Sequence, residues 1–183
     1  MSGILALSPE HIEVLEAHYQ LLLRWNRVLN LTRIDNLEEV VERHYCESLF
    51  LAAHLPTGPL RIADIGSGAG FPGFPVAVVR PYCELSLIEA HQRKAVFLRE
   101  ASRGRANVHI LPMRAESVKD HFDVAISRAV SYEDLANPVK SLAETVDLLT
   151  GAEEPPSDWA FRWQKPVPLP WGNQRFLCVG RAG

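Results

Sequence analysis

The segment Asp64-Ile65-Gly66-Ser67-Gly68-Ala69-Gly70-Phe71-Pro72-Gly73 is the most informative part of the sequence for the fold. It ends a short apolar run, residues 60–65, and opens a segment with helical spacing, residues 72–80. Its alternating glycines permit backbone angles that other residues avoid, and they let a ligand approach the main chain closely. The stretch therefore predicts a ligand-binding turn between a strand and a helix, with a tight turn that binds nothing as the alternative.

Two classes of cofactor fit this loop. Residues 68–73 satisfy the G-x-G-x-x-G pattern of nicotinamide and flavin dinucleotide sites. However, Pro72 and Pro75 crowd the helix start, where a pyrophosphate would need free N–H groups. Asp64 would repel a diphosphate, and it suits a cationic ligand such as S-adenosylmethionine. The loop is similar to that of Rossmann-like S-adenosylmethionine methyltransferases, and a dinucleotide-dependent oxidoreductase stays as the alternative.

Beyond the loop, strand-like runs alternate with helical segments. The runs cover residues 60–65, 85–89, 108–111 and 122–127, and the helical segments cover 72–80, 92–102 and 132–143. Such alternation predicts an α/β fold with a mostly parallel sheet and helices on both faces. Residues 159–165 and 176–179 are strand-like and joined by a proline-rich connection, which predicts an antiparallel C-terminal hairpin that closes the sheet.

The first third of the chain is helical. Ser8-Pro9 forms a helix start, and apolar residues continue at helical spacing to Leu29. A second helix is expected from the cap Asn36 to Pro56. With 183 residues in total, we expect one methyltransferase domain that comprises an N-terminal helical cap, residues 1–56, and a Rossmann-like catalytic core, residues 57–183.

Polar residues at the carboxyl ends of the predicted strands are candidates for cofactor contact. Glu89 ends the second strand, where a carboxylate can accept both ribose hydroxyls, although a solvated acid is the alternative. Ala115 and Glu116 follow the third strand and could border an adenine, although Glu116 also suits a helix start. Arg128 ends the fourth strand, where open α/β sheets place ligands.

Composition and charge narrow the class of protein. With 47% hydrophobic and 22% charged residues, the sequence is typical of a soluble globular protein, and we expect it in the cytoplasm. Three widely spaced cysteines predict neither a disulfide framework nor a metal site. The net charge of −3 argues against a nucleic-acid partner, but residues 91–114 hold six basic side chains and one acid, whereas residues 35–47 are acidic. The basic stretch suits a phosphate backbone, and a solvated helix face is the alternative.

Several short segments, in a specific order, resemble one family. They are Trp25-Asn26-Arg27, Asn30-Leu31-Thr32, Arg43-His44, Glu47-Ser48-Leu49, the glycine-rich loop, Arg114-Ala115-Glu116, Ser127-Arg128-Ala129 and Gln174-Arg175-Phe176-Leu177. Together the segments resemble the bacterial 16S rRNA (guanine-N7) methyltransferases, the glucose-inhibited division protein B family. The resemblance implies a class I methyltransferase fold and a monomeric enzyme that uses S-adenosylmethionine to methylate N7 of a guanine in the 530 loop of 16S ribosomal RNA.

The loop, the charge pattern and the resemblance together assign residues to cofactor and RNA, and the resemblance itself carries over Gly66, Phe71, Ala115, Glu116 and Arg128 to the cofactor. The expected cofactor-binding residues are Asp64, Gly66, Ser67, Gly68, Gly70, Phe71, Glu89, Ala115, Glu116 and Arg128. Arg128 is in addition expected to position the target guanine or a phosphate, with a salt bridge at a helix start as the alternative. The expected RNA-binding residues are Arg24, Arg43, His44, Arg93, Lys94, Arg105, Arg114 and Arg175. For His44 a packing role is an equal alternative, and Trp25 is either a stacking platform for a base or a core residue.

The sequence departs from the family in its C-terminal part. Family members usually have Leu-Lys-Gly after the fifth strand and a further helix before the final hairpin, whereas this chain has Leu149-Thr150-Gly151 and a proline-rich segment, residues 152–158. Glu47 stands where the family usually has aspartate. A cofactor-binding RNA-binding or assembly protein with weak catalysis is therefore the alternative function.

Overall fold

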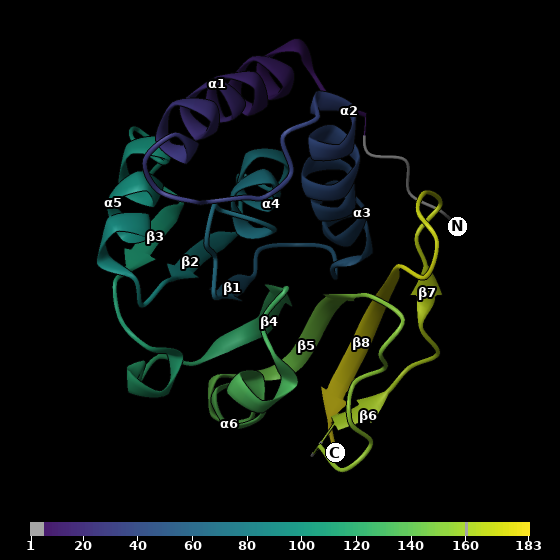
Figure 1. Cartoon of the computed structure of the whole chain (residues 1–183). Coiled ribbons are helices and arrows are strands. Elements are labelled where there is room, and N and C mark those ends of the chain that lie inside the picture. Colours follow the sequence, from purple (N-terminus) through teal and green to yellow (C-terminus); the bar gives the residue numbers. More distant parts are fainter. Residues whose placement is uncertain (1–5, 160) are drawn as a thin grey trace.

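The computed structural model describes residues 6–159 and 161–183, and its centre is a mixed sheet of eight strands (Figure 1). The strand order is β3-β2-β1-β4-β5-β8-β6, and β7 pairs with β8. The first five strands run parallel, and β8 runs antiparallel to β5, β6 and β7. The bounds are β1 Arg61–Ile65, β2 Glu84–Ile88, β3 Val108–Leu111, β4 Phe122–Arg128, β5 Ala143–Thr150, β6 Phe161–Trp163, β7 Val167–Pro168 and β8 Phe176–Ala182.

Helices cover both faces of this sheet. One face carries α1 (Pro9–Asn26), α3 (Glu47–His54), α4 (Gly73–Val79) and α5 (Gln92–Ala101), and α6 (Tyr132–Leu142) lies on the other (Figure 1). A short 3-10 helix, η2 (Ala115–Ser117), follows β3. Each face has its own buried apolar cluster, the first around Phe74 and Phe97 and the second around Leu135 and Leu142. The prediction of a class I methyltransferase architecture with an antiparallel C-terminal edge is thus confirmed.

The N-terminal helices differ in detail from the prediction. The first helix ends at Asn26 instead of Leu29, because the Asn26 side chain accepts hydrogen bonds from the backbone N–H groups of Leu31 and Thr32 at 2.7 and 2.9 Å. The second helix is continuous from 37 to 54, but it is built from α2 (Leu37–Val40), a π-helical stretch η1 (Val41–Cys46) and α3. The π-helical stretch was not visible in the sequence, since no residue pattern marks it.

The caps that the sequence predicted are present. The side chains of Ser8 and Asn36 accept hydrogen bonds from the third residue beyond them and so begin α1 and α2. Ser131 begins α6, the predicted helix 132–143, in the same way. The predicted two-strand C-terminal hairpin is present as β6 and β8, with the short β7 in addition. Within the described parts of the chain, no helix is long and apolar enough to cross a membrane. The division at residue 56 stays a prediction.

Candidate functional site

The carboxyl ends of β1, β2, β3 and β4 lie along one edge of the sheet, because these four strands are parallel neighbours. This edge brings together the glycine-rich loop after β1, Glu89 after β2, Ala115 at the start of η2 and Arg128 at the end of β4. All the residues predicted to bind cofactor therefore belong to segments that meet at this edge. Edges of this kind are where open α/β sheets bind their ligands.

The glycine-rich loop depends on backbone angles that other residues rarely adopt. Gly66, Gly68 and Gly70 have φ of +72°, +56° and +89°. A Cβ atom on Gly66 would lie 2.5 Å from a methyl carbon of Val130, whereas one on Gly68 would have only the Gly66 carbonyl oxygen nearby, at 3.8 Å. Gly68 thus leaves one side of the loop open, where a ligand can approach the main chain.

Two carboxylates hold this loop in place. Asp64 is fully buried, and its Oδ2 accepts the N–H of Gly73 at 3.0 Å, while its Oδ1 has no partner among the described residues. Burial raises the pKa of Asp64 to about 7. Glu89 accepts the N–H groups of Gly68 at 2.9 Å and His91 at 2.7 Å. The expectation that Asp64 attracts a cationic ligand directly is therefore corrected: its carboxylate is buried and shapes the loop. Each Glu89 oxygen keeps a lone pair for a hydroxyl.

A buried histidine ties the N-terminal helix to the same loop. His18 of α1 donates from Nε2 to the carbonyl oxygen of Ala69 at 3.1 Å and accepts at Nδ1 from the Tyr45 hydroxyl at 2.7 Å. Its ring also stacks on Phe74, with centroids 4.4 Å apart. Burial lowers the pKa of His18 to about 4, so the ring is neutral at neutral pH. Its hydrogen bond to Ala69 supports the loop from the side of α1.

We expect His18 to make the stability of the protein sensitive to acid. Its pKa is about 4 when folded and about 6.5 when unfolded. The unfolded chain binds the extra proton first, so the stabilisation is complete above pH 6.5 and is lost as pH falls towards 4. Urea denaturation should show the advantage of wild type over His18→Gln shrinking by roughly 2 kcal/mol between pH 7 and pH 5. The same substitution at the exposed His121 is the control, and a constant advantage would contradict this assignment.

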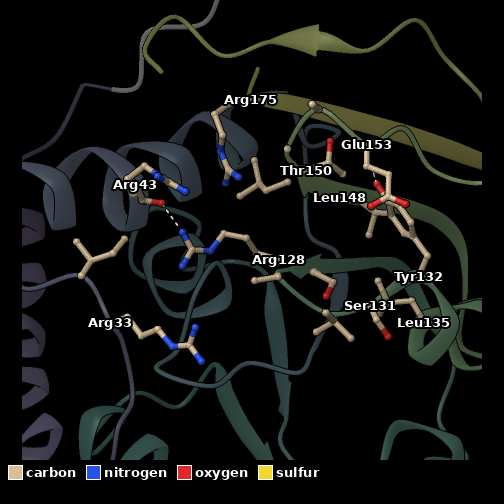
Figure 2. Close-up of a pocket in the computed structure, with 17 residues that line it drawn as sticks. Arg33, Arg43, Arg128, Ser131, Tyr132, Leu135, Leu148, Thr150, Glu153 and Arg175 are labelled. Carbon is tan, nitrogen blue, oxygen red and sulfur yellow. Dashed lines mark hydrogen bonds between the residues drawn. The ribbon is translucent and has the colours of Figure 1, made fainter. Parts of the chain in front are cut away.

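A hollow of about 760 Å³ lies beside the loop, at the carboxyl ends of β4 and β5, and its lining residues are drawn in Figure 2. Arg33, Arg43, Arg128 and Arg175 lie on one side of it, and Ser131, Tyr132 and Glu153 lie on the other. Ala129, with φ of +59°, turns the chain out of β4 into this hollow. A hollow of this size and position, with arginines along one wall, can accept a planar ring.

A single buried carboxylate organises the arginine side of the hollow. Glu47, with no exposed surface, accepts two hydrogen bonds from Arg175, at 2.9 Å from Nε and 2.7 Å from Nη2. Its oxygens also lie 3.8 Å from Nε of Arg43 and 3.7 Å from Nη1 of Arg128. The continuous helix 37–54, the end of β4 and the start of β8 therefore meet at this carboxylate. It orients three of the four arginines of the hollow.

Arg128 is fixed from a second direction. Its Nη1 donates to the carbonyl oxygen of Arg43, and its Nη2 donates to Nδ1 of His44 at 2.6 Å. Burial and the nearby Arg128 lower the pKa of His44 to about 3, so the ring accepts at Nδ1 and carries its proton on Nε2, which donates to the Thr32 hydroxyl at 2.8 Å. Burial lowers the pKa of Arg128 to about 10, but this value is still well above neutral pH, so the guanidinium stays charged. Its remaining N–H groups are available to a ligand in the hollow.

The residues predicted to bind RNA separate into several places. The hollow beside Glu47 is lined by Arg43, Arg128 and Arg175. A second hollow, between α1 and the α5–β3 turn, is lined by Arg24 and Arg105. Helix α5 carries Arg93 and Lys94, and Arg114 directly precedes η2. The prediction of an RNA contact for His44 is not supported: only 3% of its surface is exposed, and its ring stacks on Phe71. Trp25 is a packing residue, since it contacts Phe97 and donates to Glu100 at 3.0 Å.

Four residues of the site were missed by sequence reasoning or given no role. Glu47 was noted only as a departure from a family pattern, and its link to Arg175 joins residues that are 128 positions apart. His18 lies on the apolar face of α1, where a histidine gives no signal of its own. Tyr132 and Glu153 of the hollow carry no motif. Among the described residues, no group of three or more metal-ligating side chains is present.

The fold and the glycine-rich loop place the chain in the class of Rossmann-like class I S-adenosylmethionine methyltransferases. Solved structures of this class superpose on the chain, among them an S-adenosylmethionine-dependent methyltransferase from Aquifex aeolicus (TM-score 0.65, 16% identity, 82% of this chain and 96% of that one). The ribosomal protein L11 methylase from Lactobacillus delbrueckii subsp. bulgaricus also matches (TM-score 0.60, 14% identity, 74% of this chain and 77% of that one). At these identities the likeness establishes the fold.

Sequence comparison gives the family. Residues 11–149 match the GidB family model, described as rRNA small subunit methyltransferase G, and the chain belongs to this family. It is 48% identical over 137 residues to ribosomal RNA small subunit methyltransferase G of Dichelobacter nodosus, covering 70% of this chain and 64% of that protein. The protein of the same description from Xylella fastidiosa strain 9a5c is 39% identical over 150 residues, covering 81% of this chain and 63% of that protein. The chain thus spans slightly less than two thirds of these relatives.

The family match stops where the chain departs from the family pattern. The matched residues end at 149, and the next residues are Thr150 and Gly151, followed by the proline-rich segment. Thr150 is buried at the end of β5, where its hydroxyl lies 3.5 Å from the sulfur of Cys178. The part of the hollow formed by residues 150–153 therefore lies outside the residues that match the family model.

Proposed function

We propose that the protein transfers a methyl group from S-adenosylmethionine to N7 of a guanine in 16S ribosomal RNA, as a cytoplasmic monomer. The single observation that carries the proposal is the hollow with one arginine-rich wall next to the glycine-rich loop, in a chain of the rRNA small subunit methyltransferase G family. The curated relatives share that description. The guanine in the 530 loop is the target that the sequence resemblance implies.

The residues of the sheet edge fit the cofactor. The open side of the loop at Gly68 offers backbone at close approach, and Glu89 has lone pairs available at the end of β2 for ribose hydroxyls. The buried carboxyl of Asp64, whose Oδ1 has no partner among the described residues and whose pKa burial raises to about 7, lies behind the loop, where a bound cation would favour its charged form. When bound, S-adenosylmethionine supplies an electrophilic methyl group. Ala115 and Glu116 would border the adenine on the β3 side.

The chain's own contribution is mainly alignment. Guanine N7 has a lone pair and no proton, so no general base is needed, and holding the reacting atoms in line is the main task of the site. Arg128, locked by Arg43 and His44, is the residue that would hold the guanine O6 or an adjacent phosphate. Arg33 and Arg43, which are exposed or partly exposed at the hollow, would contact the backbone of the RNA.

The two alternative functions differ in what supports them. A dinucleotide-dependent oxidoreductase has no support beyond the G-x-G-x-x-G pattern, because the family and the superposed structures point to methyltransferases. An RNA-binding protein with weak catalysis is favoured by one observation, namely that the family match ends at 149. Measurable methyl-transfer turnover would distinguish the proposed methyltransferase from this weakly catalytic alternative.

Labelled-methyl transfer tests the proposal. Purified protein should transfer label from S-adenosylmethionine to unmodified 30S subunits or naked 16S RNA, with the product mapped by mass spectrometry to N7 of a guanine. Arg128→Gln should lower the rate about a hundredfold, because a charged hydrogen bond to the substrate contributes roughly 1.5–3 kcal/mol. Lys140→Ala, an exposed position on α6, is the control. Cofactor binding without transfer to any RNA would favour the weakly catalytic alternative.

A further inference from the structure

The electrostatic polarity of the hollow beside Arg128 points to a specificity for one base. Its arginine side presents N–H donors from Arg33, Arg43, Arg128 and Arg175, whereas Glu153 places a carboxylate on the opposite side (Figure 2). Glu47 holds three of these arginines, Arg43, Arg128 and Arg175. Glu153 makes no ion pair within the described part of the chain, so its oxygens are available as acceptors.

The loop that carries Glu153 is anchored to the wall of the hollow. The hydroxyl of Tyr132 donates to the carbonyl oxygen of Glu153 at 2.7 Å, and the Tyr132 ring packs edge-on against Trp159, with centroids 5.8 Å apart. Tyr132 starts α6 directly after the Ser131 cap, so its position is set by the helix. The backbone of Glu153 is therefore held at the rim of the hollow, and its side chain is one of the groups that line it.

Guanine matches this polarity edge by edge. Its Watson–Crick edge presents N1–H and N2–H donors, which suit a carboxylate, and its O6 is an acceptor, which suits an arginine. Adenine reverses both contacts, since its N6 amino group would face the arginines and its unprotonated N1 would face the carboxylate. Burying such mismatched polar groups costs binding free energy, which is the usual origin of strong discrimination.

The strand order also fixes which edge of the base faces the methyl donor. The order β1-β4-β5 places Arg128 between the glycine-rich loop after β1 and the segment after β5 that carries Glu153. In a base held by Glu153 at N1 and N2, O6 neighbours N1 and N7 lies on the adjacent Hoogsteen edge, so O6 would face Arg128 and N7 would face the loop. The contact with Glu153 would therefore leave N7 free.

We propose that Glu153 is the specificity-determining residue of the acceptor site: it accepts hydrogen bonds from N1–H and the N2 amino group of guanine and so selects guanine over adenine. This inference rests on the proposed function in taking the hollow as the acceptor site. Glu153 lies beyond residue 149, so the family match itself does not include it.

Ligand binding tests the proposal without requiring turnover. Calorimetry with guanosine, inosine and adenosine monophosphates should show that wild type prefers the guanine nucleotide, with inosine monophosphate, which lacks the N2 amino group, bound roughly tenfold more weakly. Glu153→Gln should lose at least tenfold in affinity for guanosine monophosphate and should no longer distinguish it from inosine monophosphate. Glu154→Gln, the adjacent exposed acid outside the hollow, is the matched control and should behave as wild type.

The outcomes separate this inference from the proposed function. Equal binding profiles for Glu153→Gln, Glu154→Gln and wild type would overturn the role of Glu153, and so would a wild type that binds none of the three nucleotides at millimolar concentration. Methyl transfer to RNA that persists in either case would leave the proposed function standing. Conversely, guanine selectivity that depends on Glu153 together with no methyl transfer to any RNA would refute the function and keep the base-binding role.

Discussion

Replacing Glu47 with glutamine should lower the free energy of unfolding by about 3 kcal/mol, because it removes the carboxylate that Arg43, Arg128 and Arg175 share and leaves the largely buried guanidinium groups of Arg128 and Arg175 without this counter-charge. The glutamine has nearly the same shape, so the loss reports charge and hydrogen bonding rather than packing. Arg175 should be affected most, since it loses a pair of charged hydrogen bonds at 2.9 and 2.7 Å. Urea denaturation measures the effect.

The matched control for Glu47 is Glu39→Gln. Glu39 contacts the same Arg43, at 3.5 Å, but its side chain is 49% exposed, and exposed pairs contribute about 0–1 kcal/mol. Methyl-transfer rates should separate the two variants in the same order, because Glu47 also orients Arg128. Equal stabilities of the two variants would show that the buried carboxylate is not the organising group of the site.

Replacing Gly66 with alanine should be the most damaging change in the cofactor loop. The left-handed backbone costs a residue with a Cβ atom about 1–2 kcal/mol, and the new methyl group would meet Val130 at 2.5 Å. Val130 lines the hollow beside Arg128, so relief of the clash would displace both loop and hollow. We expect a loss of about 3 kcal/mol in stability and about a hundredfold in affinity for S-adenosylhomocysteine, measured by calorimetry.

Gly58→Ala isolates the backbone part of this effect. Gly58 has φ of +95°, and a Cβ atom there would meet nothing within 4 Å. The substitution should therefore cost only the backbone strain, about 1–2 kcal/mol, and leave cofactor affinity unchanged. If both glycine variants bound the cofactor as wild type does, the loop after β1 would not be the cofactor site.

Sequence reasoning was strongest where one local pattern fixes one local structure. The glycine-rich loop requires left-handed backbone at Gly66, Gly68 and Gly70, and the structure has it at all three. The alternation of strands and helices predicted the parallel sheet, and Ser8 and Asn36 marked helix starts correctly. These signals depend on neighbours in the chain, which a sequence displays directly.

The rest of the site depends on contacts between distant segments. Whether His44 faces RNA or the interior is decided by Arg128, 84 residues further along, and by the ring of Phe71. Likewise, Asp64 was predicted to face a ligand because a single sequence shows its charge but not its burial. Arginine content predicted basic surface, but it did not predict that Arg128 and Arg175 would share one buried carboxylate with Arg43.

The long-range pair of Glu47 and Arg175 has a consequence for the order in which the protein is made. A ribosome that synthesises this chain adds Glu47 well before Arg175, 128 residues later. Until β8 has been synthesised and has paired with β5, the carboxylate lacks its closest cationic partner, and the hollow lacks one wall. The glycine-rich loop depends on earlier segments and can form first, so we expect a nascent chain to acquire its cofactor site before its acceptor site.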